Sequence, residues 1–345
     1  MQNSRLKYFD TIKGIAIFLV VMGHVLTMCI RDIDQAFSFK MIGHIHMPLF
    51  FFISGYFTYK EKDGKQFILP KLKQRFLQLI IPALVTGSMW VIYYPHSGLL
   101  SPFTNGFTGF WTDLWKNGYW FTLALFQILL IYSFLTIILK RQKSILSQLL
   151  TIGLTWFAII QFNRYIPEYY DKIFGISWWT LFFPIFMIGI MTKKYHKTLM
   201  KAINTDLAIT ISLIVASIAL YLQCYPWEFE WIRGGVMLVI KIILHISVAI
   251  IAINCTMSWE NHAPSKMFNL FSYLGKESLS IYLLHYFFLF PLTFLQEPLR
   301  NMGLGFVPTV TIAAVVASIV IAIVLGVNYI ISHSRLLRLL LVGKL

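Results

Sequence analysis

Long apolar runs recur along the whole chain, and they limit what it can fold into more than any other feature. Ten of them are long enough to cross a bilayer, which takes about 17–25 residues. They fall near residues 12–30, 42–59, 78–95, 119–139, 145–161, 176–192, 207–224, 234–255, 278–296 and 308–331. Only 12% of the 345 residues are charged, which is too few for a soluble domain. We therefore predict an all-α polytopic membrane protein with about ten transmembrane helices.

The distribution of lysine and arginine predicts the orientation of these spans. Twenty basic residues lie at the termini and in the loops on the same side, and 7 lie in the loops on the other side. Basic residues collect on the cytoplasmic side, so both termini are predicted to be cytoplasmic. The net charge of +15 then reflects topology, and nucleic acid is not an expected partner. The hydrophilic stretches are loops, so residues 1–345 are predicted to form one transmembrane domain without a separate soluble domain.

The first span, FDTIKGIAIFLVVMGHV, carries three ionisable side chains. Lys13 and His24 are eleven residues apart, which places them on one helix face about 16 Å from each other. A neutral imidazole suits a general base because its unperturbed pKa is about 6.5. An imidazole that only holds two helices together is an equally open interpretation of His24. Lys13, with Asp10 one turn before it, is typical of an interfacial anchor paired with a carboxylate.

Two other spans carry polar side chains that we single out as candidates. SLSIYLLHYFF contains Tyr282 and His285, and His285 is expected at a membrane depth similar to that of His24. Two imidazoles at one depth predict a shared polar site. HIHMPLFFFISGYF places His46 near the outer end of its span and Ser54 toward the cytoplasm. For His46, a role in proton relay or at the acceptor side and a place at the membrane interface are both open.

Three further features complete the set of candidates. Arg75, in PKLKQRFLQLIIP, suits bidentate binding of phosphate, although basic residues also anchor cytoplasmic span ends. Trp120, in GYWFTLALF, has the place of an aromatic-belt residue. Lys241 and His245 lie one turn apart in the eighth span, and the sequence assigns them no role. The histidines lack acidic partners at ligand spacing, so no metal is expected.

Four of these motifs occur together in a known family. Asp10, Lys13-Gly14 and His24, followed by HMPLFFFISGYF, YWFTLALF and SIYLLH, resemble the ordered motifs of the acyltransferase 3 family of integral-membrane acyltransferases. The resemblance covers essentially the whole chain. Two departures stand out: Lys13 replaces a frequent arginine, and Arg75 is followed by Gln78 where the family often has a second arginine.

The resemblance implies an O-acyltransferase of the bacterial inner membrane. It would move an acyl group, usually acetyl, from cytoplasmic acyl-CoA to a hydroxyl of a cell-surface polysaccharide or glycolipid precursor. His24 would be the catalytic base or acyl carrier, and Asp10 and His285 are further catalytic candidates. Lys13 and Arg75 would bind the phosphates of the donor. The candidates for acceptor contact or support of the site are His46, Ser54, Trp120 and Tyr282.

A transporter or flippase for a glycan or a small polar solute is the main alternative, because its midplane polar groups would line a pathway. It predicts repeated halves with matching broken helices, and the sequence has no clear internal repeat. A structural or sensory membrane protein comes third. The acceptor, the size of the acyl group and a homo-oligomeric state are all left open by the sequence.

Overall fold

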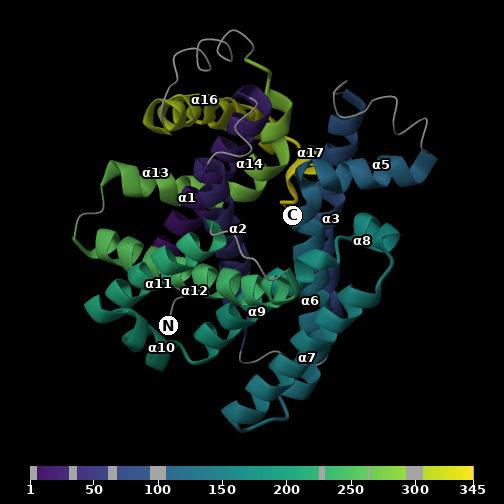
Figure 1. Cartoon of the computed structure of the whole chain (residues 1–345). Helices are drawn as coiled ribbons and strands as arrows, with labels where there is room; N and C mark the ends of the chain where they lie inside the picture. The colour runs from purple at the N-terminus through teal and green to yellow at the C-terminus, as the bar shows by residue number, and fades with distance from the viewer. Residues whose placement is uncertain are drawn as a thin grey trace. The chain divides into compact units, whose positions relative to one another are not determined.

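The computed structural model describes residues 6–30, 37–60, 68–93, 106–224, 230–262, 265–292 and 306–344 (Figure 1). Within these ranges the chain is helical and contains no strand. The longer helices are α1 (Lys7–His24), α2 (Phe37–Thr58), α3 (Ile68–Tyr93), α6 (Trp120–Leu139), α7 (Ile145–Tyr165), α9 (Ser177–Lys194), α11 (Asp206–Cys224), α12 (Glu230–His262) and α16 (Phe306–Ser332). The shorter helices are α5 (Gly106–Leu114), α8 (Glu168–Phe174), α10 (His196–Ile203), α13 (Lys266–Lys276), α14 (Ser278–Leu284) and α17 (Arg335–Val342).

Seven helices in the described part of the chain are long and apolar enough to cross a membrane. An eighth span results if α8 and α9, which meet at a bend of 51°, count as one. The seven coincide with predicted spans, and the other predicted spans fall on α2, on the α8–α9 pair and on α14. The fold is therefore that of a multi-pass helical membrane protein, and the number ten stays a prediction.

The ninth predicted span differs most from the structure. In place of a continuous helix over 278–296, α14 ends at Leu284 and passes into a 3₁₀ turn, η5 (His285–Phe288). The chain is extended at Leu289 and reaches Pro291, which has no N–H to continue a helix. Residues 293–296 of this prediction, like 94–95 of the third predicted span, lie outside the described residues.

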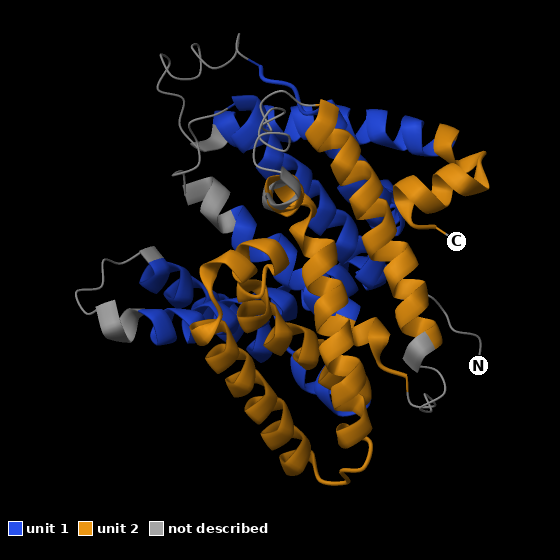
Figure 2. Cartoon of the chain, turned by 90° about the vertical axis from the view of Figure 1, so that its right-hand side faces the viewer, with its two compact units in different colours: residues 1–54, 195–329 blue, residues 55–194, 330–345 orange. Residues whose placement is uncertain are grey.

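Unit 1 comprises residues 1–54 and 195–329 (Figure 2, blue). Its centre is the close packing of α1 on α13, where two glycines let the backbones touch. A Cβ atom added at Gly14 would lie 1.8 Å from the carbonyl oxygen of Phe271. One added at Gly275 would lie 1.7 Å from the carbonyl oxygen of Asp10. Helices α11 and α12 pack on each other in the same unit.

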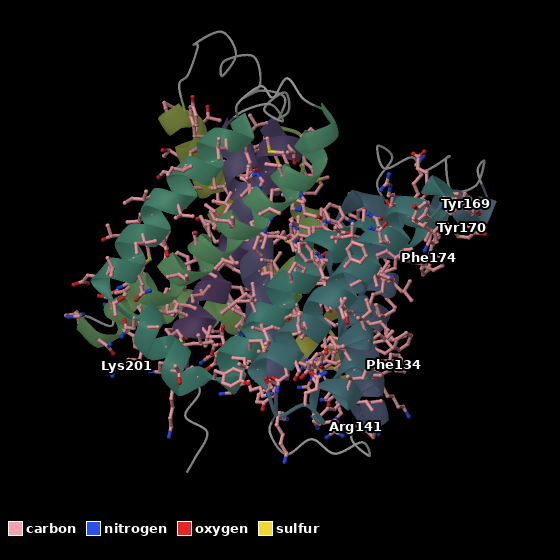
Figure 3. All side chains as sticks on the ribbon, turned by 60° about the horizontal axis from the view of Figure 1, so that its bottom comes forward. Phe134, Arg141, Tyr169, Tyr170, Phe174 and Lys201 are labelled. Carbon is pink, nitrogen blue, oxygen red and sulfur yellow. The ribbon has the colours of Figure 1, made fainter. Side chains whose placement is uncertain are left out.

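Unit 2 comprises residues 55–194 and 330–345 (Figure 2, orange). Within it, α3 contacts α6 and α17, and α7 packs against α9. Phe134 is 68% exposed on α6, and α7 exposes leucines and then aromatic side chains along its length, as lipid-facing helices do. Arg141 and the aromatic pair Tyr169 and Tyr170 lie toward opposite ends of this unit (Figure 3). A basic end and an aromatic end are typical of helices that cross a bilayer.

Candidate functional site

His24 is the last residue of α1 and is half-buried. Directly after it the helix widens into a π-helix, η1 (Val25–Ile30), a rare geometry that occurs mostly at functional sites. The carbonyl of His24 accepts a hydrogen bond from the Thr27 hydroxyl at 3.3 Å, which helps to support the altered turn. Because α1 is continuous from Lys7, Lys13 and His24 are separated by a helical rise of about 16 Å, as the sequence predicts.

The side chain of His24 meets two consecutive residues of η5. Its Nε2 atom and the hydroxyl of Tyr286 are joined by a hydrogen bond of 2.8 Å. The ring of His285 lies 5.2 Å from the His24 ring, measured between centroids. His285 and Tyr286 are both fully buried. The structure thus brings together the two predicted imidazoles and adds a phenol that the sequence did not single out.

Tyr286 was missed although helical spacing offered a signal for it. Residues at i, i+3 and i+4 share a helix face, so Tyr282, His285 and Tyr286 would lie together, but only the i, i+3 pair Tyr282 and His285 was singled out. In the structure the rings of His285 and Tyr286 lie 4.1 Å apart at the start of the 3₁₀ turn. Pro291, five residues downstream, marks the end of regular helix.

The hydrogen bonds of His285 determine its tautomer. Nδ1 lies 3.0 Å from the carbonyl oxygen of Ile281 and 2.9 Å from that of Tyr282. Carbonyl oxygens only accept, so Nδ1 carries the proton and Nε2 of the neutral ring is an acceptor. Nε2 is buried and has no hydrogen-bond partner among the described residues. A ligand that donates a hydrogen bond would satisfy it, so His285 suits a hydroxyl rather than an oxyanion.

Three further sequence candidates come from α14 and α2. The ring of Tyr282 lies 6.3 Å from that of His285 and is buried. His46, on α2, lies near His24, and its Nδ1 atom is hydrogen-bonded to the carbonyl oxygen of Ile42. Ser54 lies eight residues further along α2, about 12 Å by helical rise.

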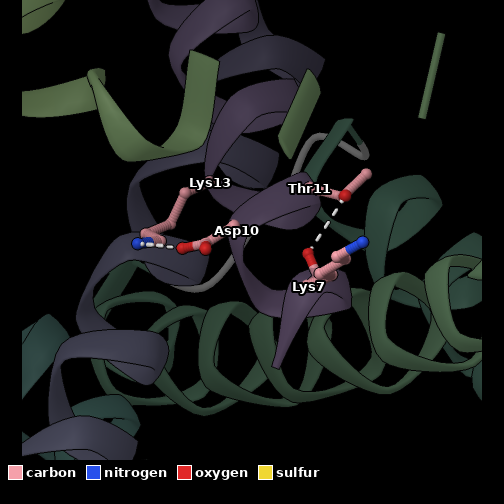
Figure 4. Close-up of polar contacts among 4 residues, drawn as sticks. All are labelled: Lys7, Asp10, Thr11 and Lys13. Carbon is pink, nitrogen blue, oxygen red and sulfur yellow. Dashed lines mark hydrogen bonds and ion pairs between the residues drawn. The ribbon is translucent and has the colours of Figure 1, made fainter. Parts of the chain in front are cut away.

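Asp10 and Lys13 form the ion pair that the sequence predicts, with Nζ 2.8 Å from Oδ1 (Figure 4). Asp10 is 3% exposed, whereas the Lys13 side chain is 22% exposed. Asp10 is separated from His24 by fourteen residues, about 21 Å along α1. The carboxylate therefore lies too far from His24 to contact the same reacting atoms, and its geometry favours a role through Lys13.

The other two candidates belong to unit 2. Arg75, exposed on α3, donates a hydrogen bond of 3.1 Å to Gln78, the residue that replaces the second arginine of the family pattern. Trp120 begins α6 after a π-helix, η4 (Trp115–Tyr119), in which Gly118 has a φ of 124°. Its ring stacks on Trp178 at 4.1 Å and on Phe182 at 5.7 Å. Trp120 thus packs in an aromatic stack, which the prediction of an aromatic-belt residue did not include.

No group of three or more histidine, cysteine or acidic side chains within the described ranges is arranged to hold a metal ion. The site of unit 1 consists of imidazole and phenol groups, which exchange protons. Fold and site together define a multi-pass membrane protein with acid–base groups buried among its helices.

Comparison with known families gives this class a name. The sequence model of a family described as an acyltransferase domain, acyltransferase 3, matches residues 6–327. The chain therefore belongs to the acyltransferase 3 family, as the motifs around His24 and His285 predict.

Two curated relatives share part of the sequence. Nodulation protein NolL of Sinorhizobium fredii is 36% identical over 131 residues, which is 35% of this chain and 34% of NolL. Nodulation protein NolL of Mesorhizobium japonicum is 41% identical over 86 residues, 24% of this chain and 23% of its own length. The chain thus spans about a third or less of the length of these relatives. No solved structure matches it significantly.

Proposed function

We propose that this protein is a membrane acyltransferase that moves an acyl group, most simply acetyl, from cytoplasmic acyl-CoA to a hydroxyl of a cell-surface polysaccharide or glycolipid precursor. The observation that carries the proposal is the hydrogen bond between His24 Nε2 and the Tyr286 hydroxyl, beside the unsatisfied Nε2 of His285. Membership of the acyltransferase 3 family supports the reaction class. The lipid bilayer and a glycan or lipid-linked sugar are the further partners that this function needs.

The proposed chemistry is attack of the acceptor oxygen on the thioester carbonyl carbon. The acceptor O–H gives its proton to the Tyr286 oxygen while the Tyr286 proton passes to His24 Nε2, because a hydroxyl both donates and accepts. The C–S bond then breaks, an ester forms, and the leaving thiolate takes the proton back by the same route. If His24 is instead an acyl carrier, its Nε2 atom would attack the thioester carbonyl itself. The hydrogen bond between Nε2 and the Tyr286 hydroxyl would then have to break first.

The donor is proposed to enter from the cytoplasmic end of α1. Lys13 would bind its phosphates, held in place by Asp10 at 2.8 Å, and Arg75 of unit 2 is proposed as a second phosphate ligand. An extended pantetheine arm is about as long as the rise of about 16 Å from Lys13 to His24. Entry of the donor from the cytoplasm requires α1 to begin on the cytoplasmic side. We therefore include in the proposal ten spans with both termini in the cytoplasm, and one transmembrane domain in a bacterial inner membrane.

Binding of acetyl-CoA to the detergent-purified protein tests the donor half of this proposal. At 100 times its dissociation constant, a ligand should stabilise the folded protein by about 2.7 kcal/mol. We expect a rise in melting temperature for the wild type and for His24→Gln, and a reduced rise for Lys13→Ala and Arg75→Ala. Lys140→Ala, an exposed lysine in a turn, is the matched control and should shift like the wild type. If the folded wild type shows no rise in melting temperature with any acyl-CoA tested, acyl-CoA is not the donor.

Tyr286→Phe tests whether Tyr286, which contacts His24, takes part in proton transfer and Tyr282 does not. The substitution removes one oxygen and keeps the buried ring, so the fold should persist. We expect transfer of radiolabelled acetyl into the glycan fraction of membrane vesicles to fall by about 10²-fold or more, because a proton-transfer partner of His24 is lost. Tyr282→Phe is the matched control and should lose much less. Equal losses in the two variants would contradict the proposed proton route.

A further inference from the structure

A second group of basic side chains lies in unit 1, on α2 and α12. The ring of His44 is 5.9 Å from the ring of His245, measured between centroids. Lys241 lies one turn before His245 on α12 and close to His44. His245 is only 2% exposed, and His44 and Lys241 are half-buried. We call these three residues the basic cluster.

The basic cluster contains no acidic side chain. Lys241 makes no hydrogen bond or ion pair within the part of the chain that the structure describes. On its own helix the acidic residues are Glu230 and Glu260, about 16 and 28 Å away by helical rise. Elsewhere among the described residues of unit 1, Asp206 is exposed at the start of α11, Asp10 pairs with Lys13, and Glu277 accepts a hydrogen bond from Asn328 at 2.8 Å. A cation among membrane-spanning helices is costly unless an anion or a polar partner compensates it.

The basic cluster and the site at His24 are both close to one stretch of α2. His44 belongs to the cluster, and His46 lies near His24. His44 and His46 are two residues apart on α2, about 3 Å by helical rise, and they lie on different faces of that helix. The basic cluster and the site at His24 therefore lie at the same level along α2.

We propose that Lys241, His44 and His245 bind the phosphate of a membrane-borne ligand, and that this ligand is the acyl acceptor. Phosphate matches the cluster because it accepts several charge-assisted hydrogen bonds from ammonium and imidazole groups. The ligand is an amphiphile because α12 is one of the helices apolar enough to cross the membrane. The link to the acceptor rests on the proposed acyltransferase function, whereas the phosphate site itself does not.

The test compares farnesyl phosphate with farnesol on the detergent-purified full chain, with melting temperature as the readout. We expect a shift with farnesyl phosphate and none with farnesol. Lys241→Met should weaken the apparent affinity about 10–100-fold, the value of hydrogen bonds to a charged group. Lys241→Arg should keep most of the shift, and Lys140→Met, an exposed lysine, should keep all of it. Equal shifts with the phosphate and the alcohol, no shift, or a shift unchanged in Lys241→Met would each overturn the site.

Two further arms identify the source of the phosphate and separate this proposal from the acyltransferase function. Nanodiscs of phosphatidylcholine with or without phosphatidylglycerol test an ordinary phospholipid. A shift that depends on both phosphatidylglycerol and Lys241 would keep the phosphate site and overturn its assignment to the acceptor. Acetyl-CoA should stabilise Lys241→Met as much as wild type. If acetyl-CoA has no effect on either protein while farnesyl phosphate still acts through Lys241, the acyltransferase function fails and the phosphate site stands.

Discussion

Replacing Gly275 by alanine is expected to push α13 away from α1 and to lower the stability of the protein strongly. The added Cβ would lie 1.7 Å from the carbonyl oxygen of Asp10 and 3.0 Å from the backbone nitrogen of Gly14. Both contacts are with helix backbone, so no side-chain rotation relieves them. Overpacking a core costs about 1–3 kcal/mol and sometimes more, and a clash between two backbones belongs at the upper end. Such a loss is large against a total stability of about 5–15 kcal/mol.

The measurement is the yield of monodisperse protein in detergent and its melting temperature. Gly326→Ala on α16 is the matched control, because it lies in the same unit and a Cβ there would meet nothing within 4 Å. Alanine is favoured over glycine inside a helix by up to about 1 kcal/mol, so this control should be at least as stable as wild type. Gly14→Ala should repeat the effect of Gly275→Ala from the other helix. If Gly275→Ala melts like the control, α1 and α13 do not pack as described.

His24→Gln is expected to abolish acyl transfer while leaving the fold and the binding of acetyl-CoA in place. Glutamine is similar in size and can still hydrogen-bond the Tyr286 hydroxyl, but it cannot take up a proton. General acid–base catalysis contributes about 10²–10⁴-fold to a rate, and the activity should fall by that factor. The assay is incorporation of radiolabelled acetyl into the glycan fraction of membrane vesicles at equal protein level.

His285→Gln serves as the comparison, because its ring lies 5.2 Å from His24 and has the buried Nε2 atom described above. We expect a smaller loss of transfer rate than in His24→Gln, together with weaker use of the acceptor. The reverse order, with His24→Gln active and His285→Gln inactive, would move the base to His285. If both variants keep their activity, His24 and His285 do not act as acid or base in the reaction.

Spacing along continuous helices could be predicted well from the sequence. The apolar runs correspond to helices, and Asp10 pairs with Lys13 as three-residue spacing on a helix suggests. The two imidazoles predicted at one depth, His24 and His285, are indeed neighbours. These predictions succeed because each depends on a local, regular geometry that the residue pattern specifies.

Irregular backbone and contacts between distant segments could not be predicted in this way. The π-helix after His24 and the 3₁₀ turn from His285 to Phe288 interrupt the regular α-helix, and the hydrogen bond between Tyr286 and His24 joins residues 262 positions apart. The contact of Gly14 with α13 depends on a residue hundreds of positions away. A glycine in a span has many uses, and only the packing shows which one applies.

The hydrogen bond between His24 and Tyr286 also has a consequence for how the protein is made. Its two residues are 262 positions apart, and ribosomes add about 5–20 residues per second. After His24 has been synthesised, about 13–50 s pass before Tyr286 exists. During that time α1 is in the membrane with its ionisable side chains but without α13 and η5. We therefore expect nascent chains truncated before α13 to need a chaperone or insertase to shield α1, and to be degraded quickly without one.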